Sequence, residues 1–320
     1  MHKDVAGVLP SQEIKNLIHC KNVSSLNKDI NIKQVQPSSL DLTLSDRAWR
    51  IGASFLPGKN YKVEQVLRDV AIYDVSLAKM TVFEKGCLYL VKLNERLNLD
   101  SKTYGSANAK SSSGRIDLFT RLLSDYSDEF DNIKVGYSGN LYAEIQPKSF
   151  SVGVKKGLSL NQIRFKQGNV KVQDIELYEL QKRYNLVDTY PDINDGLGFS
   201  ISLKSAGSDL LGYKARANAP VIDLSKTDYY EPIDYWEEIR SKNASLVLNP
   251  NDFYILNSRE SVKIPSGYAA EMLPYLAKIG EFRVHYAGFF DPGFGAEKET
   301  KSKAVLEVRC HEAPFRLEHG

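Results

Sequence analysis

Short runs in which apolar and polar residues alternate occupy most of the chain and predict an architecture built mainly from strands. β-Branched and aromatic residues fill these runs, and Gly, Pro, Asn and Asp lie between them, as is typical of strands and turns. The clearest predicted strands span 39–51, 87–99, 140–147 and 158–165. Many short strands separated by turn residues favour a β-sandwich or a barrel-like core.

Helical periodicity is confined to three stretches. In 11–20, Ile14 and Ile18 recur at helical spacing, so a short helix is predicted there. Residues 174–187 predict a second helix, and 230–241 predict a third on a less regular pattern. Helices are therefore expected to be few and short.

The second half of the chain repeats the first. The matched segments and residues are 87–99 with 252–264 (Tyr89 with Tyr254, Glu95 with Glu260), 141–145 with 304–308 (Glu144 with Glu307), 135–139 with 292–295, and, less closely, 38–44 with 198–203. A period near half the chain length indicates a duplicated domain rather than a solenoid. We expect repeat one at 1–172, a connecting helix and linker at 173–196, and repeat two at 197–320, which lacks a match to the last strand of repeat one.

Composition narrows the class of protein. A chain of 320 residues suggests about two domains. With 42 Lys and Arg against 40 Asp and Glu, the formal charge of +2 is too balanced for a protein whose main partner is nucleic acid or an anionic membrane. No apolar run approaches the roughly 20 residues that span a bilayer, and no signal-peptide pattern is present. The three cysteines do not favour a disulfide framework, so we expect a cytoplasmic protein.

Most familiar catalytic patterns are missing from the sequence. The five histidines form no zinc-ligand spacing with each other or with cysteine, so no zinc site is expected. No nucleophile elbow, Walker loop or dinucleotide fingerprint is present. The chemistry that remains lies in the serine-rich segment 110–115 and in the two glutamates matched by the repeat.

The serine-rich segment reads KSSSGR and places a glycine and three serines between two basic residues. Hydroxyl and backbone N–H donors beside fixed positive charge suit phosphate oxygens. From composition alone, a flexible polar turn is the alternative. Glu144 lies inside the apolar strand LYAEI, where a carboxylate either faces solvent or points inward as a functional group.

Three segments of the first half resemble the deoxycytidine triphosphate (dCTP) deaminase branch of the trimeric dUTPase superfamily. They are VQPSSLDLTL (35–44), KSSSGR (110–115) and GYSGNLYAEI (136–145). In the second half, HYAGFFDPGFG (285–295) and AVLEVR (304–309) resemble the base-binding hairpin and the glutamate strand of the same family. The resemblance implies a mainly β fold with two tandem dUTPase-like domains, of the β-clip or distorted jelly-roll type, and a few short helices.

The resemblance also implies a reaction, the hydrolytic deamination of dCTP to dUTP and ammonia, which feeds thymidylate synthesis. A glutamate is expected to act as general base and proton shuttle without zinc, and Mg²⁺ is expected to bind through the substrate triphosphate. Two alternatives stay open. One is dUTP diphosphatase activity, alone or after deamination, and the other is a non-catalytic, nucleotide-binding regulatory protein.

The family motifs assign roles to particular residues of this chain. The expected catalytic residues are Glu144, Glu307, Ser111 and Arg115. The expected substrate-binding residues are Lys110, Ser112, Ser113, Gly114, Tyr142, Ala143, Tyr286 and Asp291. For the two tyrosines, packing in the core is the alternative.

Each repeat departs from the family pattern in a different place. Repeat one lacks the Asp-Pro-Gly turn, and repeat two lacks the serines and has Lys278 in place of the trailing arginine. Sites of this superfamily form between neighbouring domains. If the serine loop pairs with a hairpin of repeat two, Glu307 is the base; if it pairs with another copy of repeat one, the base is Glu144. The resemblance further implies dCTP and deoxynucleotide effectors as ligands and a homo-oligomer, with a trimer favoured, and no nucleic-acid or membrane partner.

Overall fold

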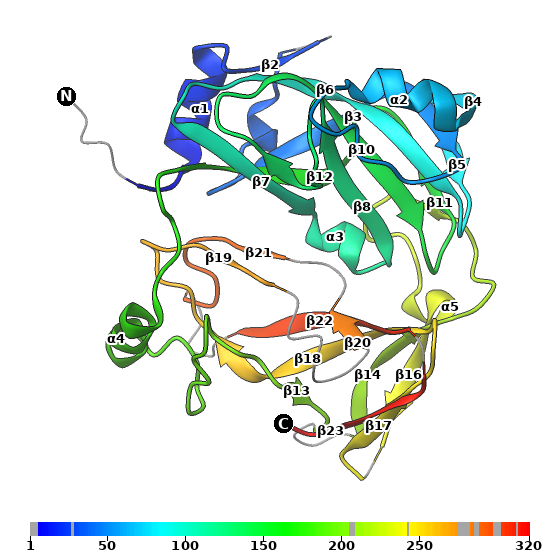
Figure 1. Cartoon of the computed structure of the whole chain (residues 1–320). Coiled ribbons are helices and arrows are strands. Elements are labelled where there is room, and N and C mark those ends of the chain that lie inside the picture. The colour runs from blue at the N-terminus through cyan, green and yellow to red at the C-terminus, as the bar shows by residue number, and fades with distance from the viewer. Residues whose placement is uncertain are drawn as a thin grey trace. The chain divides into compact units, whose positions relative to one another are not determined.

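The chain divides into two compact units, each built mainly from strands (Figure 1). Unit 1 comprises residues 1–170 and 220–230, and unit 2 comprises 171–219 and 231–320. The computed structural model describes residues 6–26, 29–204, 209–241, 243–273, 282–284, 288–296, 302–311 and 313–320. The mainly β fold class predicted from the sequence is confirmed.

Unit 1 contains most of the strands described here, three α-helices and one 3₁₀ helix. Its helices are α1 (Ser11–His19), the 3₁₀ helix η1 (Ile32–Gln34), α2 (Val63–Val70) and α3 (Ser111–Gly114). Its strands are β1 (Gly7–Val8), β2 (Val23–Ser25), β3 (Leu40–Ile51), β4 (Ala71–Ser76), β5 (Thr81–Phe83), β6 (Leu88–Asn98), β7 (Thr103–Ala109), β8 (Leu118–Ser124), β9 (Asn132–Ile133), β10 (Ser138–Pro147), β11 (Val152–Val154), β12 (Ser159–Gln167) and β15 (Ile222–Asp223).

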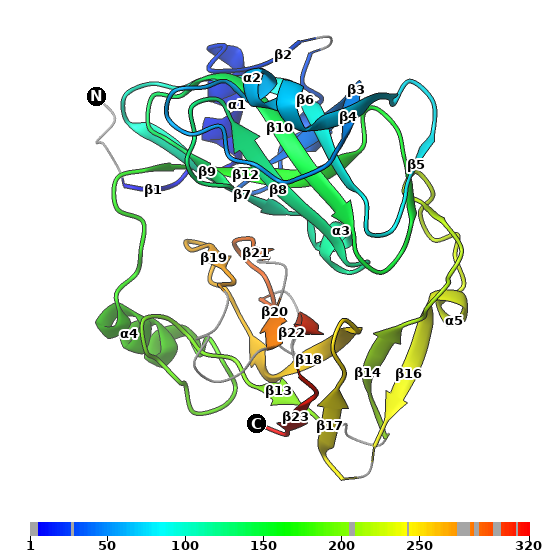
Figure 2. The same ribbon diagram turned by 45° about the vertical axis from the view of Figure 1, so that its right-hand side comes forward.

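The main sheet of unit 1 curls around a single core. Its strand order is β8-β10-β6-β3-β12-β7-β9, so Leu118 on β8 and Ala107 on β7 lie near opposite ends of the order. Both side chains nevertheless belong to one buried apolar cluster, to which β3 contributes Leu40, Leu42 and Leu44. On the outer face, α2 covers a second cluster that includes Tyr142 (Figure 2). The structure thus has the barrel-like core that the strand pattern favours.

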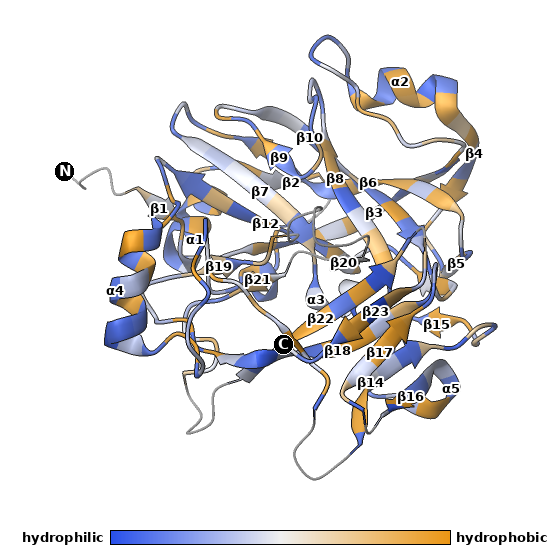
Figure 3. Ribbon diagram, turned by 60° about the horizontal axis from the view of Figure 1, so that its bottom comes forward, coloured by the Kyte–Doolittle hydropathy of each residue, from blue (hydrophilic) through white to orange (hydrophobic). Residues whose placement is uncertain are grey.

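Unit 2 is built around a smaller sheet. Its helices are α4 (Asp174–Tyr184) and α5 (Pro232–Tyr235), and its strands are β13 (Ile201–Ser202), β14 (Leu210–Ala215), β16 (Trp236–Arg240), β17 (Ser245–Leu248), β18 (Phe253–Val262), β19 (Ala270–Glu271), β20 (Phe282–Val284), β21 (Phe289–Phe290), β22 (Ser302–Cys310) and β23 (Phe315–Glu318). The sheet order is β16-β14-β18-β22-β20, while β23 pairs with β17 in a separate ribbon. Hydrophobic and hydrophilic residues are mixed along the strands of both units (Figure 3).

The two units share one pair of antiparallel strands in the same register. In unit 1, β10 pairs with β6 so that Glu144 lies opposite Leu90. In unit 2, β22 pairs with β18 so that Glu307 lies opposite Ile255. Leu90 follows Tyr89 and Ile255 follows Tyr254, so the structure aligns the strands as the sequence repeat does.

The equivalent tyrosines Tyr89 and Tyr254 each bond to the turn that precedes their own strand. Tyr89 Oη accepts a hydrogen bond from the backbone N–H of Glu84 at 3.2 Å. Tyr254 Oη accepts one from the backbone N–H of Asn249 at 2.9 Å. In both units the donor precedes the tyrosine by five residues. The repeated tyrosine therefore fixes the turn that enters the strand.

The repeated glutamates Glu95 and Glu260 have the same structural task. Glu95 accepts hydrogen bonds from the backbone N–H and the hydroxyl of Thr43, at 2.8 and 2.7 Å. Glu260 accepts the same two bonds from Ser200, at 2.8 and 2.6 Å. Each carboxylate thus holds a neighbouring strand segment, and Thr43 is equivalent to Ser200.

The helix predictions were correct for two stretches and wrong for most of the third. Helix α1 fits the expectation, and α4 ends at Tyr184 because Asn185 adopts a left-handed conformation with φ 54°. In 230–241 only α5 is helical, and β16 follows it. Pairing of β16 with β14 overrides the local helical pattern. Helix α2 was not predicted.

Candidate functional site

The serine-rich segment forms one helical turn, α3, between β7 and β8. Its backbone is fixed to β12, because the N–H of Lys110 donates to the carbonyl of Leu160 at 2.9 Å. The Ser113 hydroxyl donates to the same carbonyl at 3.0 Å, and both Ser113 and Gly114 are buried. Two of the four residues of the serine loop predicted to bind substrate, Ser113 and Gly114, are therefore buried inside the turn.

The outer side of the turn carries three exposed residues, Ser111, Ser112 and Arg115. Two hydroxyls and one guanidinium are thus presented together by a turn whose backbone is held in place. Arginine offers several N–H donors in a rigid plane, which matches the oxygens of a phosphate. This is the part of the loop that a nucleotide triphosphate could reach.

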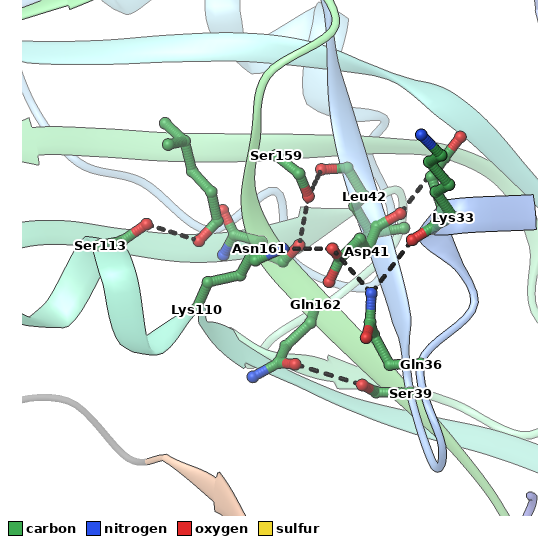
Figure 4. Close-up of polar contacts among 12 residues, drawn as sticks. Lys33, Gln36, Ser39, Asp41, Leu42, Lys110, Ser113, Ser159, Asn161 and Gln162 are labelled. Atoms are coloured by element: carbon green, nitrogen blue, oxygen red, sulfur yellow. Dashed lines mark hydrogen bonds and ion pairs between the residues drawn. The ribbon is translucent and has the colours of Figure 1, made fainter. Parts of the chain in front are cut away.

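Lys110 is occupied by a partner that sequence reasoning missed. Its ammonium group forms an ion pair with the carboxylate of Asp41 on β3 (Figure 4). Asp41 is 6% exposed and also accepts a bond from Gln36 at 3.4 Å. A lone acidic residue between the leucines of LDLTL was the available signal. A phosphate group that binds Lys110 would have to compete with this carboxylate.

Polar side chains continue from Asp41 across three neighbouring strands. Gln162 on β12 lies opposite both Asp41 and Asn108, and its amide donates to Asn108 at 3.1 Å. Ser39 donates its hydroxyl to Gln162 at 3.2 Å. The adjacent Asn161 is buried, and neither polar atom of its amide has a hydrogen-bond partner among the described residues. This polar row lies beside the base of the serine turn.

Glu144, the strand glutamate of unit 1, is fully buried and paired with an arginine. Its Oε1 accepts from Arg121 Nε at 3.1 Å and from Arg121 Nη2 at 2.6 Å. Its Oε2 is buried with no hydrogen-bond partner among the described residues. Arg121 lies directly opposite on β8, stacks over Phe130 at 3.7 Å and donates to Ser54. Sequence reasoning missed Arg121, since cross-strand register decides which residue faces Glu144.

The two residues before Glu144 are packed into the protein. Ala143 belongs to the main core, and Tyr142 is 1% exposed beneath α2. The Tyr142 hydroxyl donates to Glu64 at 3.1 Å, and Glu64 also accepts from Lys92 at 2.9 Å. Burial, together with the charge of Glu64, raises the pKa of the Tyr142 hydroxyl far above its usual range. Core packing is thus the role that the structure shows for Tyr142.

The turn at 291–294 of unit 2 has the same backbone conformation as the turn at 134–137 of unit 1. The N–H of Phe294 donates to the carbonyl of Asp291 at 3.1 Å, and Gly293 has φ 87°. In unit 1 the N–H of Tyr137 donates to the carbonyl of Lys134 at 3.2 Å, and the glycine between them has φ 71°. Left-handed φ favours glycine, which explains why both turns keep it. Lys134 therefore occupies the position of Asp291.

Glu307 is 5% exposed on β22, at the register position that Glu144 has on β10. Tyr286 and Lys278, also singled out from the sequence, lie outside the described residues. Within unit 1 the structure brings the serine turn and its basic neighbours together. Within unit 2 it places Asp291 in the turn that precedes β22 in the chain, and Glu307 on β22. The pairing of a loop with a hairpin stays a prediction.

Two further observations concern metals and membranes. Within the described part of the chain, no three His, Cys, Asp or Glu side chains gather as a metal site would require. In the same part, no helix is long and apolar enough to cross a membrane.

Comparisons with known proteins agree with this architecture. Residues 5–169 match the model of the 2′-deoxycytidine 5′-triphosphate deaminase (DCD) N-terminal domain, and residues 173–320 match that of its C-terminal domain. The crystal structure of 2′-deoxycytidine 5′-triphosphate deaminase from Agrobacterium tumefaciens is similar, with a TM-score of 0.95 and 44% identity. That match covers 98% of this chain and 92% of the other. A search of curated proteins found no match.

The chain is mainly β, repeats one pair of antiparallel strands, and carries a serine turn and two strand glutamates. These are the features expected of a dUTPase-like nucleotide enzyme. The family models cover nearly the whole chain. This protein belongs to the dCTP deaminase family.

Proposed function

We propose that this protein converts dCTP and water to dUTP and ammonia. The observation that carries the proposal is the serine turn, which presents Ser111, Ser112 and Arg115 outward in a chain matched along its length by dCTP deaminase domains. The turn has the chemistry for a triphosphate, and the strand glutamates have the chemistry for proton transfer.

The reaction needs a base for water and an acid for the leaving amine. Water adds through its oxygen to C4 of cytosine while a glutamate carboxylate takes one of its protons. The resulting tetrahedral carbon then loses its amino group as the C4–N bond breaks, and the carboxyl returns the proton so that ammonia leaves. The hydroxyl proton that stays on the added oxygen passes to ring N3, and this oxygen becomes the C4 carbonyl of uracil. Carboxylates can serve in both steps when they are positioned within hydrogen-bond reach.

The other groups bind and orient the substrate. Ser111 would position the water, and Arg115 with Ser112 would hold phosphate oxygens. Mg²⁺ would accompany the triphosphate, since this ion is usually held by substrate phosphates rather than by a full set of protein ligands. We further propose a homotrimer in the cytoplasm that responds to deoxynucleotide effectors, as the family resemblance implies.

One assay tests the reaction. The purified protein is incubated with dCTP and Mg²⁺, ammonia is measured, and dCTP, dUTP and dUMP are separated by ion-exchange chromatography. Deamination yields dUTP and ammonia in equal amounts. Accumulation of dUMP and pyrophosphate would identify the bifunctional alternative, and binding of dCTP without turnover would identify a regulatory protein. Activity that persists with a zinc-selective chelator supports the carboxylate mechanism.

Light scattering of the purified protein tests the trimer. A mass near three times that of the 36.0 kDa chain is expected. Monomer at all concentrations would contradict it.

A further inference from the structure

Residues 220–230 belong to unit 1, although the chain before and after them belongs to unit 2. The N-terminal family model, which matches residues 5–169, does not include them. Within this segment, β15 pairs in parallel with β11 and completes the small sheet β15-β11-β5. Unit 1 is therefore built from two separate stretches of sequence.

The edge of β11 is satisfied by backbone groups of this segment. The N–H of Ile222 donates to the carbonyl of Ser151 at 3.0 Å. The N–H of Leu224 donates to the carbonyl of Gly153, also at 3.0 Å. Since β11 pairs with β5 on its other side, removing the segment would turn β11 into an edge strand. Unpaired edges of this kind invite pairing with another extended chain.

Two apolar side chains anchor the segment. Ile222 and Leu224 are two residues apart, and both pack against the main buried cluster of unit 1. Val221, which precedes them, is 42% exposed, as the alternation of side chains along a strand leads one to expect. The β11 edge therefore fits a segment that carries large aliphatic residues at alternate positions.

The close approach of the segment depends on a glycine of β11. Gly153 lies opposite Asp223 in the strand register. A Cβ atom at position 153 would lie 2.9 Å from the sulfur of Met80 and 3.4 Å from the Cα atom of Asp223. A larger side chain would therefore have to displace the backbone of the segment. Glycine within a strand commonly marks such a close approach of a second backbone.

The segment is also shaped by its own hydrogen bonds. The Tyr230 hydroxyl accepts a bond from the backbone N–H of Asp223 at 2.6 Å. The carboxylate of Asp223 accepts bonds from the N–H and the hydroxyl of Ser225, at 3.0 and 2.7 Å. A segment that is already ordered by internal bonds loses less conformational entropy when it docks.

We infer that the β11 edge of unit 1 is a strand-acceptor site and that residues 220–230 are its partner, a clasp supplied by the same chain. The backbone bonds give the pairing, the two aliphatic anchors give its register, and Gly153 makes room for it. Because the clasp follows β14 in the sequence, unit 1 is completed only after the chain has been synthesised as far as residue 230. This inference does not depend on the proposed deamination.

Hydrogen–deuterium exchange of the full chain tests the clasp. Ile222→Ser combined with Leu224→Ser removes both anchors and should speed amide exchange within 220–230 by about 100-fold, because docked strand amides exchange only when the strand opens. Val221→Ser is the matched control and should exchange like the wild type. A folded double variant in which the segment stays protected would overturn the inference.

A substitution on the acceptor side covers the case in which the double variant does not fold. Gly153→Val should undock the clasp by itself and lower the melting temperature. Leu224→Ala, a milder loss of one anchor, should lower the melting temperature of the wild type but not that of Gly153→Val, where the clasp is already undocked. Additive losses would contradict a shared site.

Exchange at two protein concentrations identifies the chain that supplies the clasp. Docking within one chain predicts that protection of 220–230 is the same at both concentrations. Protection that grows with concentration would show that the segment docks on a second copy, and would overturn the assignment to the same chain.

Discussion

The strand pairs β6/β10 of unit 1 and β18/β22 of unit 2 have the same register but carry different side chains. In unit 1, β10 pairs with β6 and carries Glu144, which forms an ion pair with Arg121. The turn that precedes β10 contains Lys134. In unit 2, β22 pairs with β18 and carries Glu307 at the equivalent register position. The turn that precedes β22 in the chain contains Asp291. The features held in common are those that satisfy backbone groups, such as the tyrosine that accepts an N–H from the preceding turn.

This difference shows how a duplicated domain can specialise. Buried backbone N–H groups need partners in both copies, so residues that supply them are retained. Side chains that no buried backbone group requires can differ between the copies, and in unit 1 this position carries the ion pair between Glu144 and Arg121. Four predictions test how the two units differ.

The largest effect is expected in the serine turn, which occurs in unit 1 alone. Arg115→Ala removes the exposed guanidinium of the turn and should lower kcat/KM for dCTP by about 10²–10³-fold, the range typical for loss of one electrostatic contact to a reacting ligand. Arg68→Ala, at an exposed position of α2, should leave kcat/KM unchanged. Equal losses in both variants would mean that general positive charge, rather than the turn, attracts the substrate.

Removing Arg121, the basic partner in the ion pair with Glu144, should strongly destabilise unit 1. Arg121→Met leaves the Glu144 carboxylate buried without its partner, at an expected cost of about 3 kcal/mol in the free energy of unfolding. Urea denaturation at neutral pH measures this change. If Glu144→Leu is added to Arg121→Met, most of the loss should be recovered because no buried charge remains. If Arg121→Met alone is as stable as the wild type, the ion pair of Arg121 with Glu144 contributes nothing to the free energy of unfolding.

A smaller effect concerns the buried glutamate of unit 1 that holds Thr43. Burial raises the pKa of the Glu95 carboxyl, although its hydrogen bonds from Thr43 and Gln34 oppose the shift. Between the ordinary glutamate pKa and this raised pKa, the folded state binds more protons than the unfolded state, so the stability contributed by Glu95 is present at low pH and is lost as pH rises.

In Glu95→Gln that loss is absent, and the stability advantage of the wild type over the variant should therefore shrink as pH rises from 4 upward. Urea midpoints of both proteins at each pH provide the measurement. A difference that stays constant or grows with pH would contradict the raised pKa.

The smallest effects on stability are expected at the two equivalent tyrosines, and they should be of equal size in the two units. Tyr89→Phe and Tyr254→Phe each remove one acceptor for a backbone N–H and should each cost about 1 kcal/mol. Differential scanning fluorimetry of the two variants measures the loss in each unit. A loss in only one of them would show that the turns are not equivalent in energy, despite their equal geometry.

Much of this architecture followed from local sequence patterns. Strands β3, β6, β10 and β12 were predicted within about two residues, because alternation of apolar and polar side chains reports directly on a sheet with one buried face. Tyr89, Tyr254, Glu95 and Glu260 were recognised as pairs from sequence spacing, and their hydrogen bonds are equivalent. The stretch 236–240 was mistaken for helix because its strand partner is distant in sequence.

The candidate site could be predicted only in part. The serine turn was found because its residues are contiguous, and the roles of its members then depended on which side of the turn they occupy. Asp41 and Arg121 were missed, since each meets its partner across strands. The acidic residue of LDLTL marks Asp41 but not its partner Lys110, and nothing in the local sequence marks the pairing of Arg121 with Glu144.

Residue type and short-range spacing were enough to predict the main strands, the repeat and the candidate serines and glutamates. The fold was needed to show that Lys110 pairs with Asp41, that Ser113 is buried, and that Glu144 pairs with Arg121. These contacts depend on strand register and burial, which bring together residues far apart in the chain. The same forces that close the core thus decide which charged groups remain available for chemistry.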